Sequence, residues 1–180
     1  MDQTATAAPI RGQDTLHPDG QYSAVAKVFH WVTVPLMGLA LATGLTIRFI
    51  GEEAKMAFYA LHESMGLIIL ALALARLGWR LASPPPGLPG HLPPAMRRVA
   101  GGVHHGLYAA LVAQPLLGFF TTNAYGFPQQ GATAFLGFID LPKFMAANET
   151  LALVLHWMHS LLGWALLPLI GAHVAGAIYH

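Results

Sequence analysis

The sequence of 180 residues contains no cysteine and very little charge. Without cysteine the chain forms no disulfide, no iron–sulfur cluster, no thiolate zinc site and no thioether-linked c-type haem. Only 9% of its residues are Asp, Glu, Lys or Arg, against about 25% in typical soluble domains. The formal net charge of +1 offers little attraction for nucleic-acid phosphate. A water-soluble enzyme and a nucleic-acid-binding protein are therefore both disfavoured.

Apolar residues and histidines are what the chain has instead. Hydrophobic residues make up 55% of the sequence and the mean hydropathy is +0.53, which favours a membrane protein. The 10 histidines outnumber both the 9 Lys and Arg residues and the 8 Asp and Glu residues. Because an ionisable side chain inside a membrane is expensive and usually functional, the histidines are the first candidates for a site.

Four segments are long and apolar enough to span a bilayer as helices, which takes roughly 20 residues each. We expect an all-α membrane protein whose one domain, residues 23–180, is a four-helix transmembrane bundle. A polar, disordered cytoplasmic segment at residues 1–22 should precede it. Pro35, Pro115 and Pro168 fall inside the spans and should bend the helices without breaking them. The expected spans are residues 23–50, 57–81, 103–122 and 151–179.

The basic residues indicate how the bundle lies in the membrane. With the N-terminus inside, six of the nine Lys and Arg residues fall on the inner side, which predicts that both termini are cytoplasmic. The Pro-rich inner connection at 82–102 should be semi-rigid. The apolar outer segment at 123–150 should lie on the membrane surface or fold back over the bundle. The inner basic residues are Arg11, Lys27, Arg76, Arg80, Arg97 and Arg98, and the outer ones are Arg48, Lys55 and Lys143.

Two histidines of the last span have a spacing that places both on one helix face. His159 and His173 are 14 residues apart, and at about 100° per residue they return to the same face within roughly 40° and lie about 21 Å apart. Each has a partner at matching depth on another span, His62 for His159 toward the outer side and His30 for His173 toward the inner side. Two facing imidazoles, twice over, suit two bis-His b-type haems, whose main task is electron transfer.

Small and basic residues near these histidines support the haem interpretation. Gly66 and Gly163 each follow a histidine by four residues, and the missing side chain would let a flat macrocycle approach the helix. Arg76 follows His62 by 14 residues, so its guanidinium should point toward the inner site. A haem propionate or a quinone headgroup would be a suitable partner for it there.

Two other interpretations of the histidines remain open at this point. They are also consistent with ordinary hydrogen-bonded residues at helix interfaces, and imidazole binds transported zinc, copper or nickel. Transporters of divalent cations usually add carboxylates or thiolates, and here only Glu63, near an interface, is close. His17 and His91 lie in polar or Pro-rich segments, and we assign them no role.

Short motifs in a fixed order carry a resemblance to a known family. They are FHW at 29–31, LHESMG at 61–66, ARLGWR at 75–80, HHGLYAALVAQPLLG at 104–118, FLGFIDLP at 135–142, and HSLLG at 159–163 with GAH at 171–173. The chain resembles the bacterial cytochrome b561 family, small four-helix di-haem proteins of the inner membrane. Its layout is also similar to that of the b-type subunits that anchor some formate dehydrogenases and nickel-iron hydrogenases.

The resemblance implies that the last span supplies one ligand to each haem. His173 would pair with His30 at the inner haem, and His159 with His62 at the outer haem. A histidine also stands in the family where His104 stands here, which implies a contact with a propionate or a quinone. Members usually continue into a basic tail after the point where this chain ends. No role is carried over to His105, His156 or His180.

Members that resemble this chain look like superoxide oxidases. The expected function is therefore transfer of electrons from superoxide outside, through two haems, to membrane ubiquinone. His156 and Lys143 would steer an anion toward the outer haem, and Arg76, His104 and Arg80 would contact quinone near the inner haem. The alternative is a membrane-anchor and electron-relay subunit of a dehydrogenase or hydrogenase complex. The expected partners are quinone, the outer-side donor and membrane lipid, with no nucleic acid and with a homodimer left open.

Overall fold

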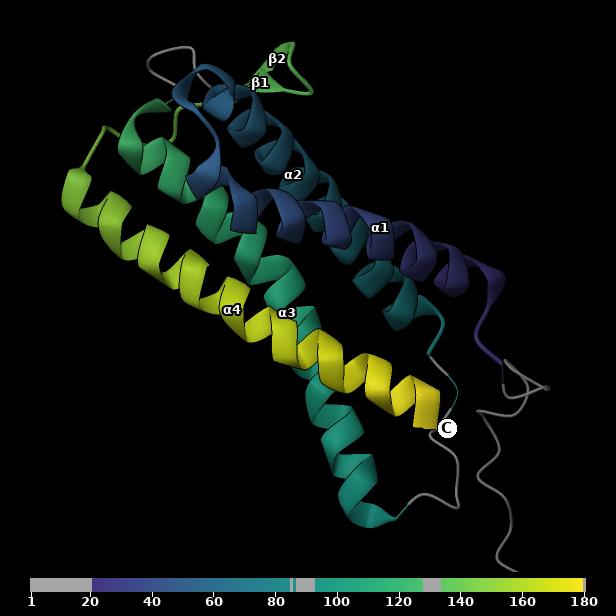
Figure 1. Ribbon diagram of the computed structural model, residues 1–180. Helices are drawn as coiled ribbons and strands as arrows, with labels where there is room; N and C mark the ends of the chain where they lie inside the picture. The colour runs from purple at the N-terminus through teal and green to yellow at the C-terminus, as the bar shows by residue number, and fades with distance from the viewer. Residues whose placement is uncertain (1–20, 85, 87–92, 128–133, 180) are drawn as a thin grey trace, which may run out of the picture.

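Long helices dominate the computed structural model of the chain, which describes residues 21–84, 86, 93–127 and 134–179 (Figure 1). A short 3₁₀ turn, η1 (Ile47–Phe49), follows the first helix. A hairpin of two short strands, β1 (Ala134–Phe135) and β2 (Ile139–Asp140), precedes the last one. Within the described residues the long helices are α1 (Ala24–Thr46), α2 (Glu52–Ala82), α3 (Pro94–Tyr125) and α4 (Glu149–Tyr179).

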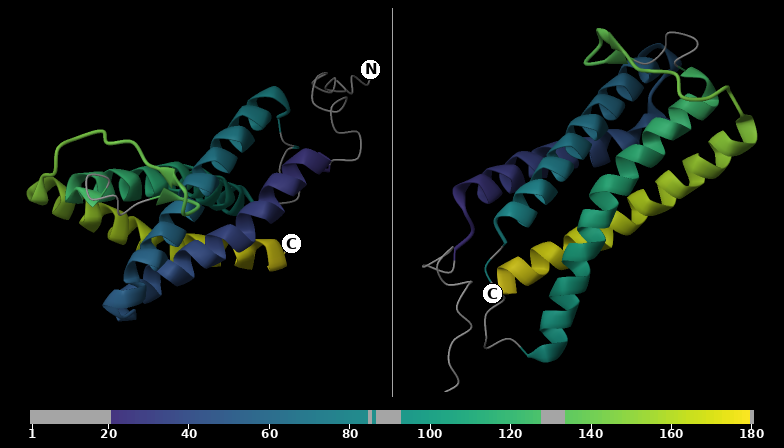
Figure 2. Two further views of the ribbon diagram at one scale, coloured as in Figure 1. Left: turned by 90° about the horizontal axis from the view of Figure 1, so that it is seen from above. Right: turned by 180° about the vertical axis from the view of Figure 1, so that it is seen from behind.

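The helices pack against one another in chain order. The most extensive contact is between α3 and α4, followed by the contacts of α2 with α1 and with α3. The start of α1, the end of α2, the start of α3 and the end of α4 lie at one end of the bundle, which we call the inner end (Figure 1, Figure 2). η1 and the hairpin lie at the opposite end, which we call the outer end. Histidines near the two ends of these helices are therefore placed in two separate layers.

Local sequence accounts for where the helices begin and end. Ser23 caps α1, because its Oγ accepts a hydrogen bond of 3.3 Å from the backbone N–H three residues later. Pro94 opens α3, where its missing N–H has no intrahelical partner to lose. Gly126 ends α3 in the left-handed conformation, with φ at 83°. Asn148 precedes α4, and its Oδ1 accepts a hydrogen bond of 2.9 Å from the N–H of Leu151.

Two helices begin earlier than the sequence predicts. α3 starts at Pro94 and is helical through Gly101 and Gly102, so the inner connection is shorter than the predicted 82–102. α2 starts at Glu52, where two glutamates in the first turn stabilise the helix N-terminus. In both cases polar or basic residues extend the helix past the apolar core of the span, which hydropathy alone does not register.

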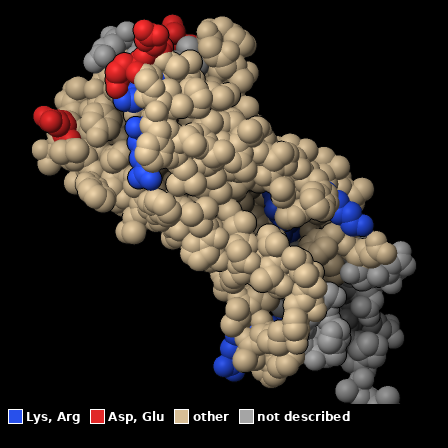
Figure 3. Space-filling model, in the orientation of Figure 1, with Lys and Arg blue, Asp and Glu red and all other residues tan. Residues whose placement is uncertain are grey.

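In the part of the chain that the structure describes, three segments are long and apolar enough to cross a membrane, namely Ala24–Phe49, Glu52–Ala82 and Glu149–Tyr179. Large apolar side chains project outward from them, with Trp31 exposed by 68%, Trp157 by 71% and Leu161 by 72%. On the face shown in Figure 3, the acidic side chains gather at the outer end and most of the surface between the two ends is uncharged. The chain is thus a mostly helical membrane protein whose outer surface suits lipid.

α3 is long enough to span a membrane but is more polar than the other helices. It is not among the three segments that qualify by length and composition. Its polar side chains are used inside the bundle: Gln114 contacts α4, Thr122 donates a hydrogen bond to Glu63 of α2, and Asn123 is completely buried. The lower hydropathy of α3 therefore reflects contacts with its neighbours.

The outer segment folds back over the end of the bundle, which is one of the two arrangements predicted for it. The backbone N–H of Leu136 donates to Oγ of Ser64 on α2 over 2.9 Å. The backbone N–H of Phe144 donates to Oδ1 of Asn123 on α3, also over 2.9 Å. The ring of Phe144 packs edge-on against Phe119, with 5.5 Å between centroids. The segment is thus attached to two different helices.

The antiparallel hairpin within this segment is a departure from the all-α prediction. Phe135 pairs with Ile139, and Ala134 with Asp140. Leu136 and Gly137 in the turn have φ values of 55° and 80°, and positive φ at both central residues is what a type I′ turn requires. Leucine rarely adopts this conformation, so the LG dipeptide is a weak turn signal compared with Asn-Gly, and the sequence did not predict a turn.

Asn123 should be essential for attachment of the outer segment. It is 0% exposed, and Asn123→Ala removes the acceptor of the Phe144 N–H. Loss of this partly buried hydrogen bond should cost about 0.5–1.5 kcal/mol of stability. We expect a lower unfolding temperature in detergent and faster proteolysis within residues 134–148. Lys143→Ala, an exposed position in the same segment, is the control. Protease resistance equal to that of the wild type would contradict this role of Asn123.

Candidate functional site

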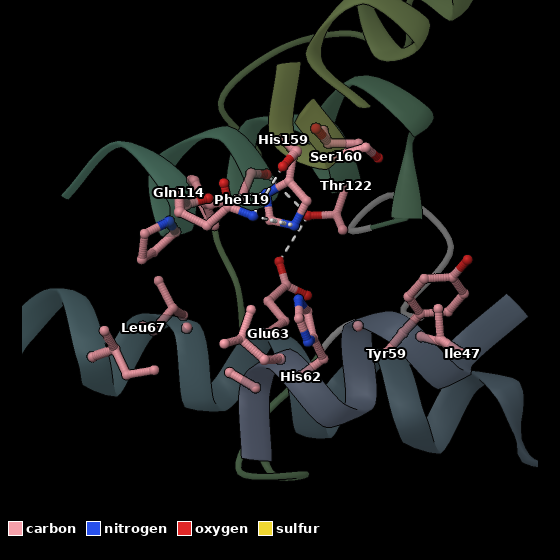
Figure 4. A pocket seen from close by; sticks show the side chains of 18 of the residues that line it. Ile47, Tyr59, His62, Glu63, Leu67, Gln114, Phe119, Thr122, His159 and Ser160 are labelled. Atoms are coloured by element: carbon pink, nitrogen blue, oxygen red, sulfur yellow. Dashed lines mark hydrogen bonds between the residues drawn. The ribbon is translucent and has the colours of Figure 1, made fainter. Parts of the chain in front are cut away.

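His62 and His159 face each other between α2 and α4 near the outer end (Figure 4). Their ring centroids are 6.0 Å apart and the ring planes meet at 81°. The rings border a cavity that is lined by residues of all four long helices. Metal–imidazole bonds of about 2 Å would place two trans imidazole centroids roughly 6 Å apart. The pair therefore has the separation that one metal ion between two rings requires.

Each of these rings is fixed by a hydrogen bond from Nδ1. The hydroxyl of Thr43 donates to the carbonyl of Leu39 over 2.8 Å, so its oxygen accepts from His62 Nδ1 over 3.0 Å. The backbone carbonyl of Gln114 accepts from His159 Nδ1, also over 3.0 Å. A proton on Nδ1 leaves the lone pair of Nε2 for a metal, which is how metal-binding histidines are commonly oriented.

Two glycines that the sequence analysis did not single out lie directly against these rings. A Cβ atom on Gly44 of α1 would lie 2.9 Å from Cε1 of His62. A Cβ atom on Gly118 of α3 would lie 3.1 Å from Cε1 of His159. The distance at Gly44 is shorter than real Cβ contacts, and the distance at Gly118 is tighter than most, so a side chain at either position would displace the ring. Each histidine is thus seated against the backbone of the neighbouring helix.

The spacing of 14 residues that links His159 to His173 recurs on all four long helices. Each helix therefore presents one residue to an outer layer and one to an inner layer. On the first and third spans the spacing joins a histidine to a glycine, which carries no polar side chain, so the sequence indicates it clearly only on the second and fourth spans. The outer layer contains Gly44, His62, Gly118 and His159, and the inner layer contains His30, Arg76, His104 and His173.

The two glycines that the sequence analysis proposed have their closest contacts with α3. A Cβ on Gly66 would lie 3.8 Å from Cβ of Pro115, an ordinary van der Waals contact, and Gly66 lines the outer cavity. A Cβ on Gly163 would lie 3.2 Å from Nε2 of Gln114. Gly163 therefore leaves space for a side-chain amide of the neighbouring helix.

Two polar side chains present buried oxygen atoms at the outer cavity. Thr122 Oγ1 donates to Oε1 of Glu63 over 2.7 Å. Gln114 Nε2 donates to the backbone carbonyl of His159 over 2.9 Å. In the described part of the chain, Oε2 of Glu63 and Oε1 of Gln114 are buried without a hydrogen-bond partner. Because buried polar atoms are normally paired, these oxygens offer acceptors to a group that enters the cavity.

His173 lies between two imidazoles near the inner end. Its ring centroid is 6.0 Å from that of His30 and 5.2 Å from that of His104. The distance to His30 equals the separation of the outer pair, so His30 is the partner at ligand spacing. The ring of His104 is closer to His173 than a second ligand of the same metal ion would be, so His104 is placed beside the pair. The structure thus brings together all four histidines in the pairs that the sequence predicts.

A second cavity near the inner end is basic and aromatic. The guanidinium carbons of Arg76 and Arg80 lie 5.3 and 5.4 Å from the centre of the Tyr108 ring, within cation–π range. Among the residues described, neither guanidinium has a carboxylate partner. Trp79 closes one wall, where its Nε1 donates to Oγ of Ser23 over 3.1 Å. The cavity suits a ligand that carries an anionic or carbonyl group.

The remaining histidines lie outside the two pairs. His105 is exposed, and its Nδ1 bonds to the carbonyl of Gly101 in the same helix over 2.7 Å. His156 is exposed on α4 and also borders the outer cavity. Three others, His17, His91 and His180, lie outside the described residues.

The chain is similar to known proteins over nearly its whole length. A family model described as prokaryotic cytochrome b561 matches residues 21–180, which include both histidine pairs and both cavities. Cytochrome b561 homolog 2 of Escherichia coli (strain K12) is 27% identical over 162 residues, which cover 89% of this chain and 84% of that protein.

The glycines of the outer layer provide a direct test of the site. Gly44→Ala and Gly118→Ala should each displace an outer imidazole and lower the amount of b-type haem bound per chain. Gly44→Ala should have the stronger effect, because its Cβ would lie 2.9 Å from the ring, against 3.1 Å at Gly118. Gly38→Ala and Gly102→Ala on the same helices, where a Cβ meets nothing within 4 Å, are matched controls. Haem content equal to that of the controls would contradict this geometry.

Proposed function

The chain belongs to the prokaryotic cytochrome b561 family, and we propose that it carries electrons from superoxide at its outer end to membrane quinone at its inner end. The family supports transmembrane electron transfer through b-type haem. The observation that carries the finer proposal is the presence of two histidine pairs, each with 6.0 Å between ring centroids, one in each layer of the bundle. Two haems in series would form a path from one side of the membrane to the other.

The residues of the outer layer fit an iron porphyrin. His62 and His159 would hold the iron through Nε2, since Nδ1 of each ring is already hydrogen-bonded. Gly44 and Gly118 leave the space that both rings occupy. When bound, haem would supply an iron that accepts and passes on one electron at a time, and His62 and His159 would be the residues that hold it.

The inner layer would hold the second haem between His30 and His173. Arg76, on the same layer, can donate hydrogen bonds to its propionates, and His104 stands beside the pair. In this proposal α3 is the fourth spanning helix, because the side chains that make it polar contact α2 and α4. The proposed architecture is therefore a four-helix transmembrane bundle around two haems.

The inner cavity is the proposed quinone site. Arg80 and Tyr108 line it together with Arg76 and His104, and these side chains can donate hydrogen bonds to a quinone carbonyl oxygen. Ubiquinone is the proposed acceptor. The excess of basic residues at this end favours a cytoplasmic location of both termini in a bacterial inner membrane.

The outer end is the proposed place of entry for superoxide. His156 is exposed at the outer cavity and Lys143 is exposed in the outer segment, so a protonated imidazole and an ammonium group can attract a small anion. Each superoxide ion gives up one electron and leaves as dioxygen. Two such electrons and two protons convert one quinone to quinol.

Removal of each histidine tests the ligand assignment. The wild-type protein should bind two haems per chain by pyridine haemochrome analysis. His62→Ala and His159→Ala should lose the same haem, and His30→Ala and His173→Ala the other, as shown by which redox transition disappears. His105→Ala, at an exposed position, should retain both. Two haems in His173→Ala would show that the inner assignment is wrong.

Stopped-flow spectroscopy of the purified protein tests the donor and the acceptor separately. Superoxide should reduce the haems faster than the uncatalysed background, and the rate should fall as ionic strength rises, because the attraction is electrostatic. Arg80→Met should slow reoxidation by ubiquinone without changing reduction by superoxide. Absence of superoxide-dependent reduction, together with a co-purifying flavin, molybdenum or nickel subunit, would favour an electron-relay subunit of a larger complex.

A further inference from the structure

Gln114 of α3 contacts three different atoms of His159 on α4. Its backbone carbonyl accepts from Nδ1 of the ring over 3.0 Å. Its side-chain Nε2 donates to the backbone carbonyl of His159 over 2.9 Å and lies 3.3 Å from Nε2 of the same ring. Figure 4 shows the amide beside the imidazole at the edge of the outer cavity. One residue of α3 thus holds both the ring and the main chain of this histidine.

The orientation of the Gln114 amide follows from the groups around it. A backbone carbonyl and the unprotonated Nε2 of an imidazole are both acceptors, so the NH₂ end of the amide must face them. The amide oxygen Oε1 then points away and is buried without a partner among the described residues. The donor of this amide therefore covers the same lone pair of His159 that would bind a metal.

Two glycines make the arrangement possible. The missing side chain of Gly118 lets the imidazole reach α3, since a Cβ there would lie 3.3 Å from His159 Nδ1. The missing side chain of Gly163 leaves room for the amide, since a Cβ there would lie 3.2 Å from Gln114 Nε2. Gly163 lies one turn after His159, so the amide fits between the histidine and the glycine on the same face of α4.

We propose that Gln114 is the positioning residue of the outer haem ligand, and that Gly163 serves the Gln114 amide rather than the macrocycle. The inference rests on the proposed role of His159 as an axial ligand. The hydrogen bond from the Gln114 side chain to the His159 carbonyl holds α4 at the ligand residue. The hydrogen bond from Nδ1 to the Gln114 backbone carbonyl holds the ring. With haem bound, Nε2 of His159 would hold the iron, and the role of the Gln114 amide would be its hydrogen bond to the His159 carbonyl.

Variants of the full-length protein in detergent test the positioning role. Gln114→Met keeps the length of the side chain but removes the donor. We expect about tenfold weaker retention of the outer haem, as is typical when a group that orients a metal ligand is lost. The reduction potential and the low-spin EPR signal of that haem should also shift. The inner haem should be unchanged, which shows that the variant is folded.

A double-mutant cycle tests the assignment of Gly163. Gly163→Ala should weaken the outer haem in the wild-type background, because it displaces the amide. In the Gln114→Ala background the same change should add no further loss, because no amide remains to be displaced. Gly171→Ala, at a position on α4 where a Cβ meets nothing within 4 Å, is the control and should change neither haem.

Three outcomes would overturn the proposal. An unchanged potential and EPR signal of the outer haem in Gln114→Met would exclude the positioning role. An equal loss from Gly163→Ala in both backgrounds would show that Gly163 faces the macrocycle. A wild-type protein that takes up no haem would refute the proposed function, and with it this inference, whereas the first two results leave the proposed function intact.

Discussion

The hydrogen bonds from Nδ1 of the two outer histidines are the interactions on which the site depends. His62 donates to Thr43 and His159 donates to the carbonyl of Gln114, so each ring on an even-numbered helix is held by the helix before it. The same two contacts require Gly44 and Gly118, because a side chain there would occupy the space of the ring. Orientation of the rings, the use of Nδ1 as the donor atom and the close approach of the helices therefore have one common cause.

The two layers are built differently although one spacing generates both. In the outer layer the histidines alternate with glycines, which gives a site with few charged groups. In the inner layer the corresponding positions of α1 and α3 are His30 and His104, and α2 contributes Arg76. The inner site is consequently crowded with imidazoles and adjoins a basic cavity. A ligand that carries oxygen atoms has hydrogen-bond donors at the inner end, whereas the outer cavity offers it mainly acceptors.

Sequence reasoning predicted the long apolar helices and the four paired histidines, because hydropathy and helical periodicity depend on single residues and their spacing. It did not predict Gln114 and Thr43 as partners of the rings, because which polar atom meets which histidine depends on how two helices are rotated against each other. It also missed the start of α3 at Pro94 and the hairpin at Leu136 and Gly137. Those features rest on helix-forming residues outside the apolar run and on an uncommon backbone conformation, to which hydropathy is insensitive.

The position of α4 at the end of the described chain has a consequence for biosynthesis. Each histidine pair takes one member from α4, and the other members belong to α1 and α2. A ribosome synthesises α4 after α1, α2 and α3, so no pair is complete while those three helices emerge. A nascent chain interrupted before His159 therefore has no complete pair of facing imidazoles. The order of the helices along the chain thus delays completion of both histidine pairs until α4 has been synthesised.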